Sequence, residues 1–386
     1  MKLLLITEIF PPIVGGSGRW FLEIYSRLKN FDSIIAAGDA PGAELFDKSH
    51  VLTCIRLPIA MKSCGVLSLY SLRKYWCLFR RISNLLKRYN NKAIHCGRGL
   101  PEGLIAYLCM KLSGIPYLCY IHGEELPAYH SSREYRLLSK LVYSNAALII
   151  VNSRNTQRSV VQYTGISDSI RVMHPGVDTD YFKPAYKNDD VSRELGWENK
   201  KIMLTVGRLQ KRKGHDHVIM ALAKIREHVQ DVLYAIVGDG EERPYLEQVA
   251  HDCGVDDIVQ FLGKVDDAKM LVCYQQCDLF VLANREVDGD FEGFGMVLLE
   301  AQACGKPVVA GNSGGTVEAM LSGETGLLVD ANSPDAIGGK VIALLSDEAR
   351  RTVMGHRAVE WVRSNFDWNV LVHQAESIFS ELVGTR

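Results

Sequence analysis

Two carboxylates bracket a glycine-rich segment in the C-terminal half of the chain. Glu292 and Glu300 stand eight residues apart in the run E-G-F-G-M-V-L-L-E. Residues 296–303 predict a buried helix, and a helix N-terminus offers unpaired N–H groups and a partial positive charge that suit a phosphate. The spacing therefore indicates a diphosphate site. A Glu that merely favours the helix dipole, with an unrelated helical Glu, would give the same pattern.

Two cations follow a predicted strand further upstream. Residues 202–206 are apolar and lead to Gly207, after which come Arg208 and, five residues later, Lys213. Arg binds a phosphate through its planar fork and Lys as a point charge, so the pair could close on a diphosphate. Lys211 and Arg212, which lie between them, are interpreted as part of a solvated turn.

A glycine-rich turn also follows the first predicted strand. Residues 2–7 are apolar, and Gly15 and Gly16 then lead into a helical pattern. Glycine lets backbone approach a phosphate closely. The run is neither G-x-G-x-x-G nor a Walker loop, so its position at the first strand-to-helix turn carries the argument.

These residues follow strands that alternate with amphipathic helices throughout the chain. Such alternation predicts an α/β fold with two parallel sheets, each Rossmann-like, that bind ligands at the carboxyl ends of their strands. The polar segment 175–201 is interpreted as the linker. The predicted strands are 2–7, 33–37, 51–57, 93–96, 117–121, 147–151 and 170–174 in the first half, and 202–206, 233–237, 258–261, 279–283, 307–310 and 326–329 in the second.

Composition narrows the class of protein. A chain of 386 residues with 47% hydrophobic content can bury two cores. The ten cysteines form no C-x-x-C pair, which favours reduced thiols and no metal site. Residues 1–183 carry 23 Lys and Arg against 13 Asp and Glu, whereas residues 184–386 carry 21 against 32. A basic half and an acidic half indicate two domains with different partners.

Taken together, these motifs resemble the family-four retaining glycosyltransferases of the GT-B fold, and within them the bacterial phosphatidylinositol mannosyltransferases and envelope-polysaccharide enzymes. The resemblance covers the whole chain. It implies two Rossmann-like domains facing a central cleft: residues 1–180 with a returning C-terminal helix, 367–386, would bind the acceptor, and residues 181–366 the nucleotide sugar. The motifs that carry it are Gly15-Gly16, His122 to Glu125, Gly207-Arg208, Lys213-Gly214, Gly238 to Gly240, His174 to Asp178 with Tyr181-Phe182, Ser313 to Glu318, and Glu292 with Glu300.

The resemblance also implies roles for the residues of the C-terminal half. Arg208 and Lys213 would hold the diphosphate and offset the charge on the leaving nucleotide, so that no metal is required. Glu300 would accept from the ribose and Glu292 would orient the sugar. Their separation is too large for the paired carboxylates of a hydrolase, so transfer with retention is expected. Further donor contacts are expected from Gly15 and Gly16 and from the turn of Gly293, Phe294 and Gly295.

His122 follows the predicted strand 117–121. The resemblance places it against a hydroxyl of the donor sugar at the reaction centre. A His that caps the next segment is the alternative. The neighbouring Glu124 or Glu125 could act as a base toward the acceptor, or the departing phosphate could do so; both readings stay open.

The nucleobase is expected at the turn after residues 258–261. In the family this turn meets the base near Val265, and Asp267 could accept from the N–H groups of guanine. GDP is therefore favoured over UDP as the donor's nucleotide. Asp266 and Asp267 would equally serve as an ordinary helix N-cap.

Residues 66–94 predict a basic amphipathic helix. The segment has no acidic residue and interleaves aromatic side chains such as Tyr70, Tyr75 and Trp76 with its cations. This composition favours peripheral contact with an anionic membrane surface at the inner face of the cell membrane. The alternative is a solvated helix whose apolar stripe is core. No nucleic-acid-binding module is recognisable, and no run of about 18 apolar residues predicts a membrane span. The basic residues are Arg73, Lys74, Arg80, Arg81, Lys87, Arg88 and Lys92.

We therefore predict a metal-independent, retaining hexosyltransferase that moves a sugar, with mannose favoured, from a nucleotide sugar to a lipid-linked or saccharide acceptor. The alternatives are a nucleotide-sugar epimerase or a phosphorylase of the same architecture, and a non-catalytic nucleotide-sugar-binding protein. A phosphorylase would need a longer chain, and an epimerase would convert its donor without an acceptor.

Overall fold

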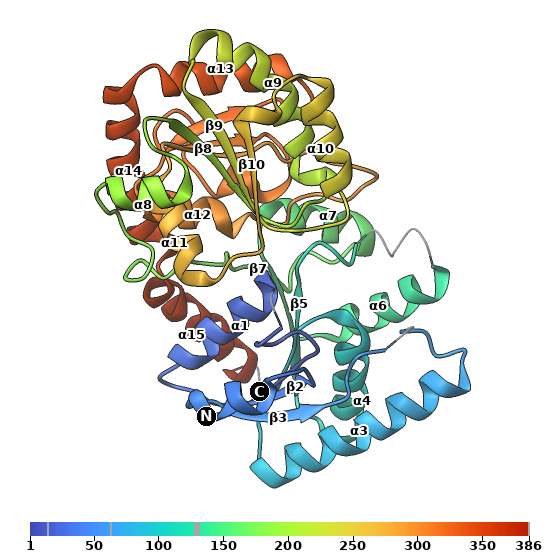
Figure 1. Ribbon diagram of the computed structural model, residues 1–386. Coiled ribbons are helices and arrows are strands. Elements are labelled where there is room, and N and C mark those ends of the chain that lie inside the picture. Colours follow the sequence, from blue (N-terminus) through green and yellow to red (C-terminus); the bar gives the residue numbers. More distant parts are fainter. Residues whose placement is uncertain (14, 62–63, 127–131, 385–386) are drawn as a thin grey trace. The chain divides into compact units, whose positions relative to one another are not determined.

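The computed structural model divides the chain into two units (Figure 1). It describes residues 1–386 except 14, 62–63, 127–131 and 385–386. Unit 1 comprises Met1–Pro175 with Trp368–Arg386, and unit 2 comprises Gly176–Asp367. The division follows Pro175 because the Val177 N–H donates to the Phe366 carbonyl and the Asp367 carboxylate accepts from Thr179, all within unit 2.

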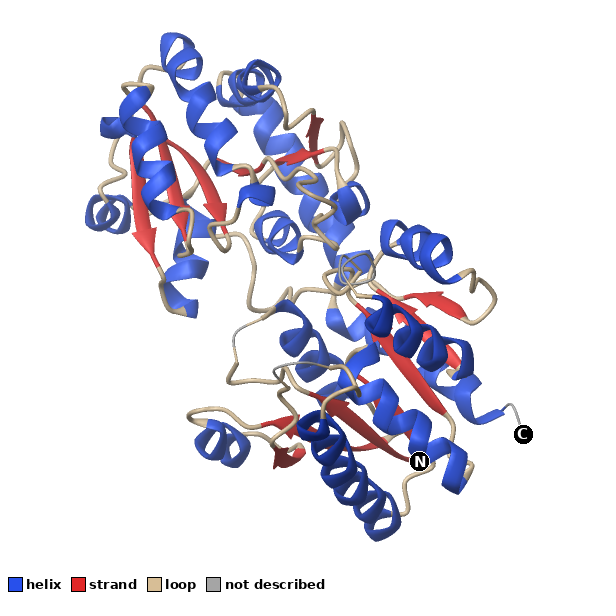
Figure 2. Cartoon of the chain, turned by 90° about the vertical axis from the view of Figure 1, so that its right-hand side faces the viewer, coloured by secondary structure: helices blue, strands red, loops and turns tan. Residues whose placement is uncertain are grey.

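Unit 1 is built on a seven-stranded parallel sheet of order β3-β2-β1-β4-β5-β6-β7. Helices cover both faces (Figure 2). The strands are β1 (Lys2–Thr7), β2 (Asp32–Gly38), β3 (Thr53–Leu57), β4 (Ala93–Cys96), β5 (Tyr117–Ile121), β6 (Leu148–Val151) and β7 (Ile170–Val172). The helices are α1 (Gly16–Arg27), α2 (Ala43–Ser49), α3 (Leu69–Tyr89), α4 (Leu104–Ser113), α6 (Arg133–Asn145), α7 (Arg154–Thr164) and α15 (Trp368–Gly384).

Unit 2 repeats this architecture with a six-stranded parallel sheet of order β10-β9-β8-β11-β12-β13. Apolar clusters pack on both faces of the sheet. The strands are β8 (Lys201–Val206), β9 (Val232–Val237), β10 (Val259–Gly263), β11 (Leu279–Leu282), β12 (Val308–Gly311) and β13 (Gly326–Val329). The helices are α8 (Asp189–Leu195), α9 (His215–His228), α10 (Arg243–Asp252), α11 (Asp267–Gln276), α12 (Met296–Ala303), α13 (Pro334–Leu345) and α14 (Glu348–Phe366).

The predicted α/β class with two parallel sheets is confirmed, since each of the thirteen predicted strands overlaps an observed one. The interpretation of residues 175–201 as a linker is wrong. Phe182, Leu195 and Trp197 are buried in the core of unit 2, and the segment contains α8. The segment is mostly polar, but a few widely spaced apolar side chains in it pack against the core of unit 2, and these were too few to reveal its burial.

Helix α15 belongs to unit 1, where it packs against α1 (Figure 1). Its Glu376 carboxylate accepts the backbone N–H groups of Lys29 and Asn30 just after α1, at 2.6 and 2.7 Å. Its Phe379 ring lies 4.5 Å from His95 and 5.9 Å from Tyr25, centroid to centroid. The last helix thus completes the core of the first unit.

Candidate functional site

Lys213 and Glu292 form the centre of the carboxyl edge of the unit 2 sheet. Lys213 ends a short 3₁₀ turn before α9, and its Nζ donates to Glu292 Oε2 at 2.5 Å. A Cβ added at Gly207 would lie 3.9 Å from the Lys213 Cε and 4.0 Å from its Nζ. The ammonium therefore lies beside the end of β8, where the sequence predicted a cation.

Arg212 is a site residue that the sequence analysis missed. Its Nη1 donates to Glu292 Oε2 at 2.6 Å, and its Nε lies 3.1 Å from Asp290. Burial opposes ionisation of Glu292, but Lys213 and Arg212 outweigh it and lower the pKa of that carboxyl to about 2. The interpretation as a solvated turn is wrong for Arg212; Lys211 is exposed.

Arg208 extends from the same edge without a carboxylate partner. It is exposed, although Val206 and Leu209 on either side of it are buried. No ion pair within the described residues involves Arg208, so its guanidinium is available to an anionic ligand. It differs in this respect from Lys213, which already holds Glu292.

The glycine-rich turn before α12 places Glu300 as well as Glu292. Gly295 adopts a left-handed φ of 89° at the helix N-cap, where no side chain caps the N-terminal amides. Glu300 is buried and accepts from the Tyr274 hydroxyl at 2.7 Å. Tyr274 is a second missed residue, because a Tyr within an apolar helix reads simply as core.

The loops at this edge pack backbone against backbone. The Gly315 N–H donates to the Glu292 carbonyl at 2.9 Å, and a Cβ at Gly314 would lie 2.3 Å from that oxygen. A Cβ at Gly214 would come within 1.8 Å of the Ala283 carbonyl. Real Cβ atoms do not approach oxygen so closely, so these positions require glycine.

A buried ion pair fixes the loop that leads to Glu292. Both guanidinium ends of Arg285 donate to Asp216, in the first turn of α9, at 2.7 and 2.8 Å. The Arg285 N–H also donates to the Arg212 carbonyl at 2.9 Å. The pair thereby ties the segment after β11 to the turn that carries Arg212 and Lys213.

At the turn predicted to meet the nucleobase, the N-cap alternative holds for one of the two aspartates. Asp266 caps α11 by accepting the Lys269 N–H at 2.8 Å. Asp267 is exposed in the first helical turn, and Val265 is half-buried against the core. Asp267 therefore keeps a side chain that faces solvent.

Gly15 and Gly16 lie at the carboxyl edge of the unit 1 sheet. Helix α1 begins at Gly16, with Gly15 as an N-cap that provides no side-chain hydrogen bond. The following Trp20 and Phe21 are buried. The predicted strand-to-helix turn is present, and its helix is anchored by the aromatic residues of the pattern.

His122 follows β5 and is buried among aromatic rings. Its ring centroid lies 5.5 Å from that of Trp20 and 5.6 Å from that of Phe21. Burial is the main cause that lowers its pKa to about 4. The ring is therefore neutral near pH 7, and because Nε2 lies 3.0 Å from the Gly97 carbonyl it carries the proton. Nδ1 is left as the acceptor.

Four carboxylates surround Arg98 near His122, among them Glu124 at 3.4 Å. Glu102, which the sequence analysis did not single out, is fully buried and accepts the Glu8 N–H at 2.8 Å. Glu125 accepts the His122 N–H at 3.1 Å. Burial raises the pKa of both Glu102 and Glu125 to about 7.

Helix α3 divides the residues of the predicted basic segment 66–94 between two faces. Tyr75 is buried, so the interpretation of this aromatic side chain as part of a membrane contact is wrong. Ile82 and Leu86 are also buried, and the apolar stripe of the helix is therefore core, as the alternative predicted. Tyr70 and Trp76 are 58% and 62% exposed and remain candidates. Within the part of the chain that the structure describes, no helix is long and apolar enough to cross a membrane.

Two family models match the chain in succession. Residues 14–181 match Glycosyltransferase Family 4, and residues 187–361 match Glycosyl transferases group 1. The boundary between the matches falls close to the boundary between the two units.

Individual proteins match over nearly the whole chain. It is 29% identical over 379 residues to a Mycobacterium tuberculosis protein named GDP-mannose-dependent alpha-(1-6)-phosphatidylinositol monomannoside mannosyltransferase, with 96% of each chain covered. It is 30% identical over 375 residues to the protein of the same name from Mycolicibacterium smegmatis, with 95% of each covered. The crystal structure of Anabaena HepE in complex with UDP has a TM-score of 0.83 at 22% identity, covers 98% of this chain and all of that one, and shares its fold.

Proposed function

The chain belongs to the family-4 glycosyltransferases, and we propose that it is a retaining, metal-independent enzyme that transfers mannose from GDP-mannose to a lipid-linked or saccharide acceptor. The observation that carries this proposal is the cluster of Arg208, Arg212 and Lys213 at the strand ends of unit 2. Relatives named GDP-mannose-dependent mannosyltransferases, similar over almost the entire chain, support the choice of sugar and nucleotide.

The charge balance of the cluster supports metal independence. Asp290 and Glu292 balance Arg212 and Lys213 there, and Arg208 forms no ion pair within the described residues, which leaves one positive charge for an incoming diphosphate. Arg208 is the cation without a carboxylate partner, and the Lys213 ammonium has three donors, so it can hold Glu292 and an oxygen of phosphate together. These groups would stabilise the charge that develops on the leaving nucleotide.

The remaining donor contacts are proposed from the chemistry of the residues. Glu300, oriented by Tyr274, would accept from the ribose hydroxyls, and Asp267 with the main chain at Val265 would meet the base. The amides of Gly15, Gly16, Gly293, Phe294 and Gly295 would donate to phosphate oxygens. Glu292, held ionised, would accept from hydroxyls of the transferred sugar.

We assign the chemical step as follows. The bond between the anomeric carbon and the phosphate oxygen breaks as the acceptor oxygen bonds to the same carbon from the same face. The departing phosphate takes the acceptor's proton. His122 donates its Nε2–H to the Gly97 carbonyl, which leaves its Nδ1 as an acceptor. Nδ1 would accept a hydrogen bond from a hydroxyl of the sugar, so His122 would position the sugar rather than transfer a proton.

Thermal unfolding with GDP, UDP, ADP and dTDP tests the donor site. A ligand at a hundred times its Kd stabilises the folded state by about 2.7 kcal/mol. We expect GDP to raise the Tm and the Arg208→Ala variant to lose that shift. Protection by UDP alone would reassign the nucleotide, and no protection by any of the four would contradict the proposal.

Incubation with GDP-mannose then tests the reaction. Transfer of mannose to a lipid extract or a mannoside, with retention at the anomeric carbon and in the presence of EDTA, is the expected result. Conversion of the donor without any acceptor would instead identify an epimerase. Activity that EDTA abolishes and a divalent cation restores would contradict metal independence.

We further propose peripheral contact with an anionic membrane at the inner face of the cell membrane. Helices α3, α4 and α6 carry one acidic residue among them, Glu134, whose carboxylate accepts the N–H groups of Val66 and Leu67. Next to the exposed cations lie exposed apolar side chains. These are Leu67, Leu69, Tyr70, Leu72, Trp76, Leu112 and Leu137.

Vesicle flotation tests the contact. Replacement of Arg80, Arg81, Lys87 and Arg88 by Gln should weaken binding to anionic vesicles, because each basic residue near such a surface contributes about 1 kcal/mol. The binding should also fall with salt. Unchanged, salt-sensitive flotation of the variant would place the contact on another surface.

A further inference from the structure

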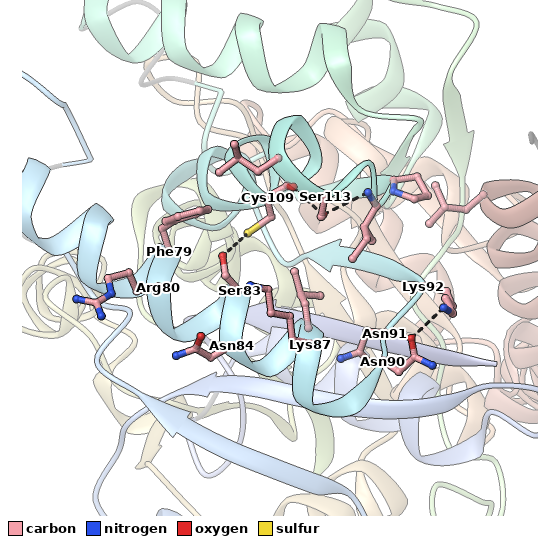
Figure 3. Close-up of a pocket in the computed structure, with 15 residues that line it drawn as sticks. Phe79, Arg80, Ser83, Asn84, Lys87, Asn90, Asn91, Lys92, Cys109 and Ser113 are labelled. Carbon is pink, nitrogen blue, oxygen red and sulfur yellow. Dashed lines mark hydrogen bonds between the residues drawn. The ribbon is translucent and has the colours of Figure 1, made fainter.

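Unit 1 contains a cavity of about 670 Å³ beneath α3 and α4 (Figure 3). Lys92 and Pro116, which line it, immediately precede β4 and β5, and Leu382 of α15 completes the wall. The cavity thus opens at the amino edge of the sheet. His122 follows the carboxyl end of β5, roughly 20 Å away along the strand. The cavity is therefore separate from the site described above, and its volume is typical of pockets for small molecules.

The rim of the cavity is cationic. Arg80, Lys87 and Lys92 line it, and none of them forms an ion pair within the described residues. Lys92 Nζ donates to the Asn90 side-chain oxygen at 2.9 Å, which holds this ammonium at the edge (Figure 3). Three cations without a carboxylate favour an anionic ligand such as a phosphodiester.

A buried amide lies in the wall of the same cavity. Asn91 is 2% exposed, and neither its Oδ1 nor its Nδ2 has a hydrogen-bond partner among the described residues. A buried polar group without a partner is costly and rare in folded proteins. An amide that lacks both a donor and an acceptor partner matches a hydroxyl group, which supplies both.

The remaining wall is apolar and reaches the surface. Phe79, Ile115 and Leu382 line the cavity, and Leu112 at its mouth is 77% exposed. The same helix α3 presents Trp76 and its cations outward. A ligand with hydrocarbon chains could therefore leave the cavity directly into the surface proposed to meet the membrane.

We propose that this cavity binds the headgroup of an anionic phospholipid that carries hydroxyl groups, of the phosphatidylglycerol type. The phosphodiester would meet Arg80, Lys87 and Lys92, a headgroup hydroxyl would satisfy Asn91, and the glycerol and first methylenes would pass Leu112. The site extends the membrane contact proposed above, on which its setting rests, into recognition of one lipid class. It does not depend on the transfer reaction.

Calorimetric titration with dihexanoyl-phosphatidylglycerol, kept below its critical micelle concentration, tests the cavity without a bilayer. We expect saturable binding of one lipid per chain. Dihexanoyl-phosphatidylcholine shares the chains but has neither net charge nor hydroxyls, and sn-glycerol 3-phosphate lacks the chains. Both should bind at least tenfold more weakly.

Three variants locate the binding. Lys87→Gln, on an exposed residue, should weaken it about fivefold. Asn91→Leu should weaken it about tenfold, while it raises the Tm of the lipid-free protein because the unpaired amide is gone. Arg158→Gln removes an exposed cation of α7 that does not line the cavity, and should leave the affinity unchanged.

Several results would overturn the proposal. Absence of saturable binding, or equal affinity for phosphatidylcholine, would exclude an anionic headgroup site. Equal affinity for sn-glycerol 3-phosphate would indicate a site for free phosphate esters. Equal losses in Arg158→Gln and Lys87→Gln would indicate attraction by the charge of the whole unit rather than binding in this cavity. Vesicle flotation and mannose transfer are measured independently of the lipid titration. The headgroup site can therefore be disproved while the proposed function stands.

Discussion

The carboxyl edges of the two sheets share an architecture but have opposite electrostatics. In unit 2, Lys213 and Arg212 outweigh burial and lower the pKa of Glu292 to about 2. In unit 1, Arg98 faces four carboxylates, and burial raises the pKa of Glu102 and Glu125 to about 7. At the unit 2 edge, cations keep a buried carboxylate ionised, whereas at the unit 1 edge burial leaves two carboxyl groups with pKa values near 7.

The difference between the two edges is opposite in sign to the difference in net charge between the two halves of the chain. The N-terminal half carries the excess of basic residues and the C-terminal half the excess of acidic ones. The cations of unit 1 lie largely on outer surfaces such as α3, whereas unit 2 concentrates a few of its cations at the strand ends. The charge of a half-chain therefore describes its outer face, and the site chemistry depends on a handful of residues.

The largest expected effect comes from the ion pair that supports the cationic edge. Arg285→Ala should destabilise unit 2 by about 3–5 kcal/mol, because it leaves the buried Asp216 carboxylate without its partner. Urea unfolding measures this loss. Lys224→Ala breaks an exposed pair with Asp335 and should cost far less, because solvent screens both charges. Equal losses in the two variants would show that burial does not distinguish the pairs.

The next effect concerns catalysis at the cationic edge. Arg208→Ala and Lys213→Ala should each lower the rate of transfer by around two orders of magnitude or more, as expected for donors that stabilise developing charge. Steady-state assays with GDP-mannose measure it. Lys211→Ala, on the exposed neighbour, serves as the matched control and should keep the wild-type rate. Wild-type turnover in Arg208→Ala would remove that residue from the mechanism.

The pH dependence of stability should have opposite signs at the two edges. The pKa of a Glu side chain in the unfolded chain is about 4.5, and folding raises the pKa of Glu102 to about 7. The contribution of Glu102 to the free energy of unfolding is therefore present below pH 4.5 and is lost as the pH rises through 7. The contribution of Glu292 is present above pH 4.5 and lost as pH falls toward 2. Relative to wild type, Glu102→Gln should therefore gain stability from pH 5 to pH 8 in urea unfolding.

Glu292→Gln provides the comparison at the other edge. It should be less stable than wild type throughout the same range, because Lys213 and Arg212 lose their charged partner. If both variants changed in the same direction between pH 5 and pH 8, the two edges would not differ electrostatically in the way described.

The smallest expected effect concerns the positioning of Glu300. Tyr274→Phe removes one hydrogen bond to that carboxylate and should weaken GDP binding about fivefold, corresponding to about 1 kcal/mol. Calorimetric titration with GDP measures the change. Tyr245→Phe, on an exposed tyrosine of unit 2, is the control. An unchanged Kd in Tyr274→Phe would separate Glu300 from the nucleotide.

The sequence was sufficient to predict the sheets because parallel strands are short apolar runs between turn residues. Residues 2–7, 93–96, 117–121 and 326–329 are predicted with their observed bounds. The prediction of a linker at residues 175–201 failed because Phe182 and Trp197 are single apolar residues among polar ones. Burial of such residues depends on the surface they meet, which no local pattern records.

The site was predictable where a residue's neighbours along the chain determine its place. Lys213 and Glu292 follow strand ends or glycine turns, and the structure brings them together. The sequence analysis missed Arg212 because a run of charged residues does not indicate which of their side chains points toward the protein interior. The sequence analysis also missed Glu102 and Tyr274, because a polar group inside an apolar helix or turn looks like part of the core.

The place of α15 has a consequence for how the protein is made. Residues 1–175 are synthesised first, but α1 lacks the helix that covers it until unit 2, residues 176–367, has been completed. At about 5–20 residues per second, this interval is on the order of 10–40 s. Unit 2 is continuous in the chain and can fold meanwhile. Unit 1, which carries α3, therefore completes its fold last, when Phe379 and Leu382 leave the ribosome.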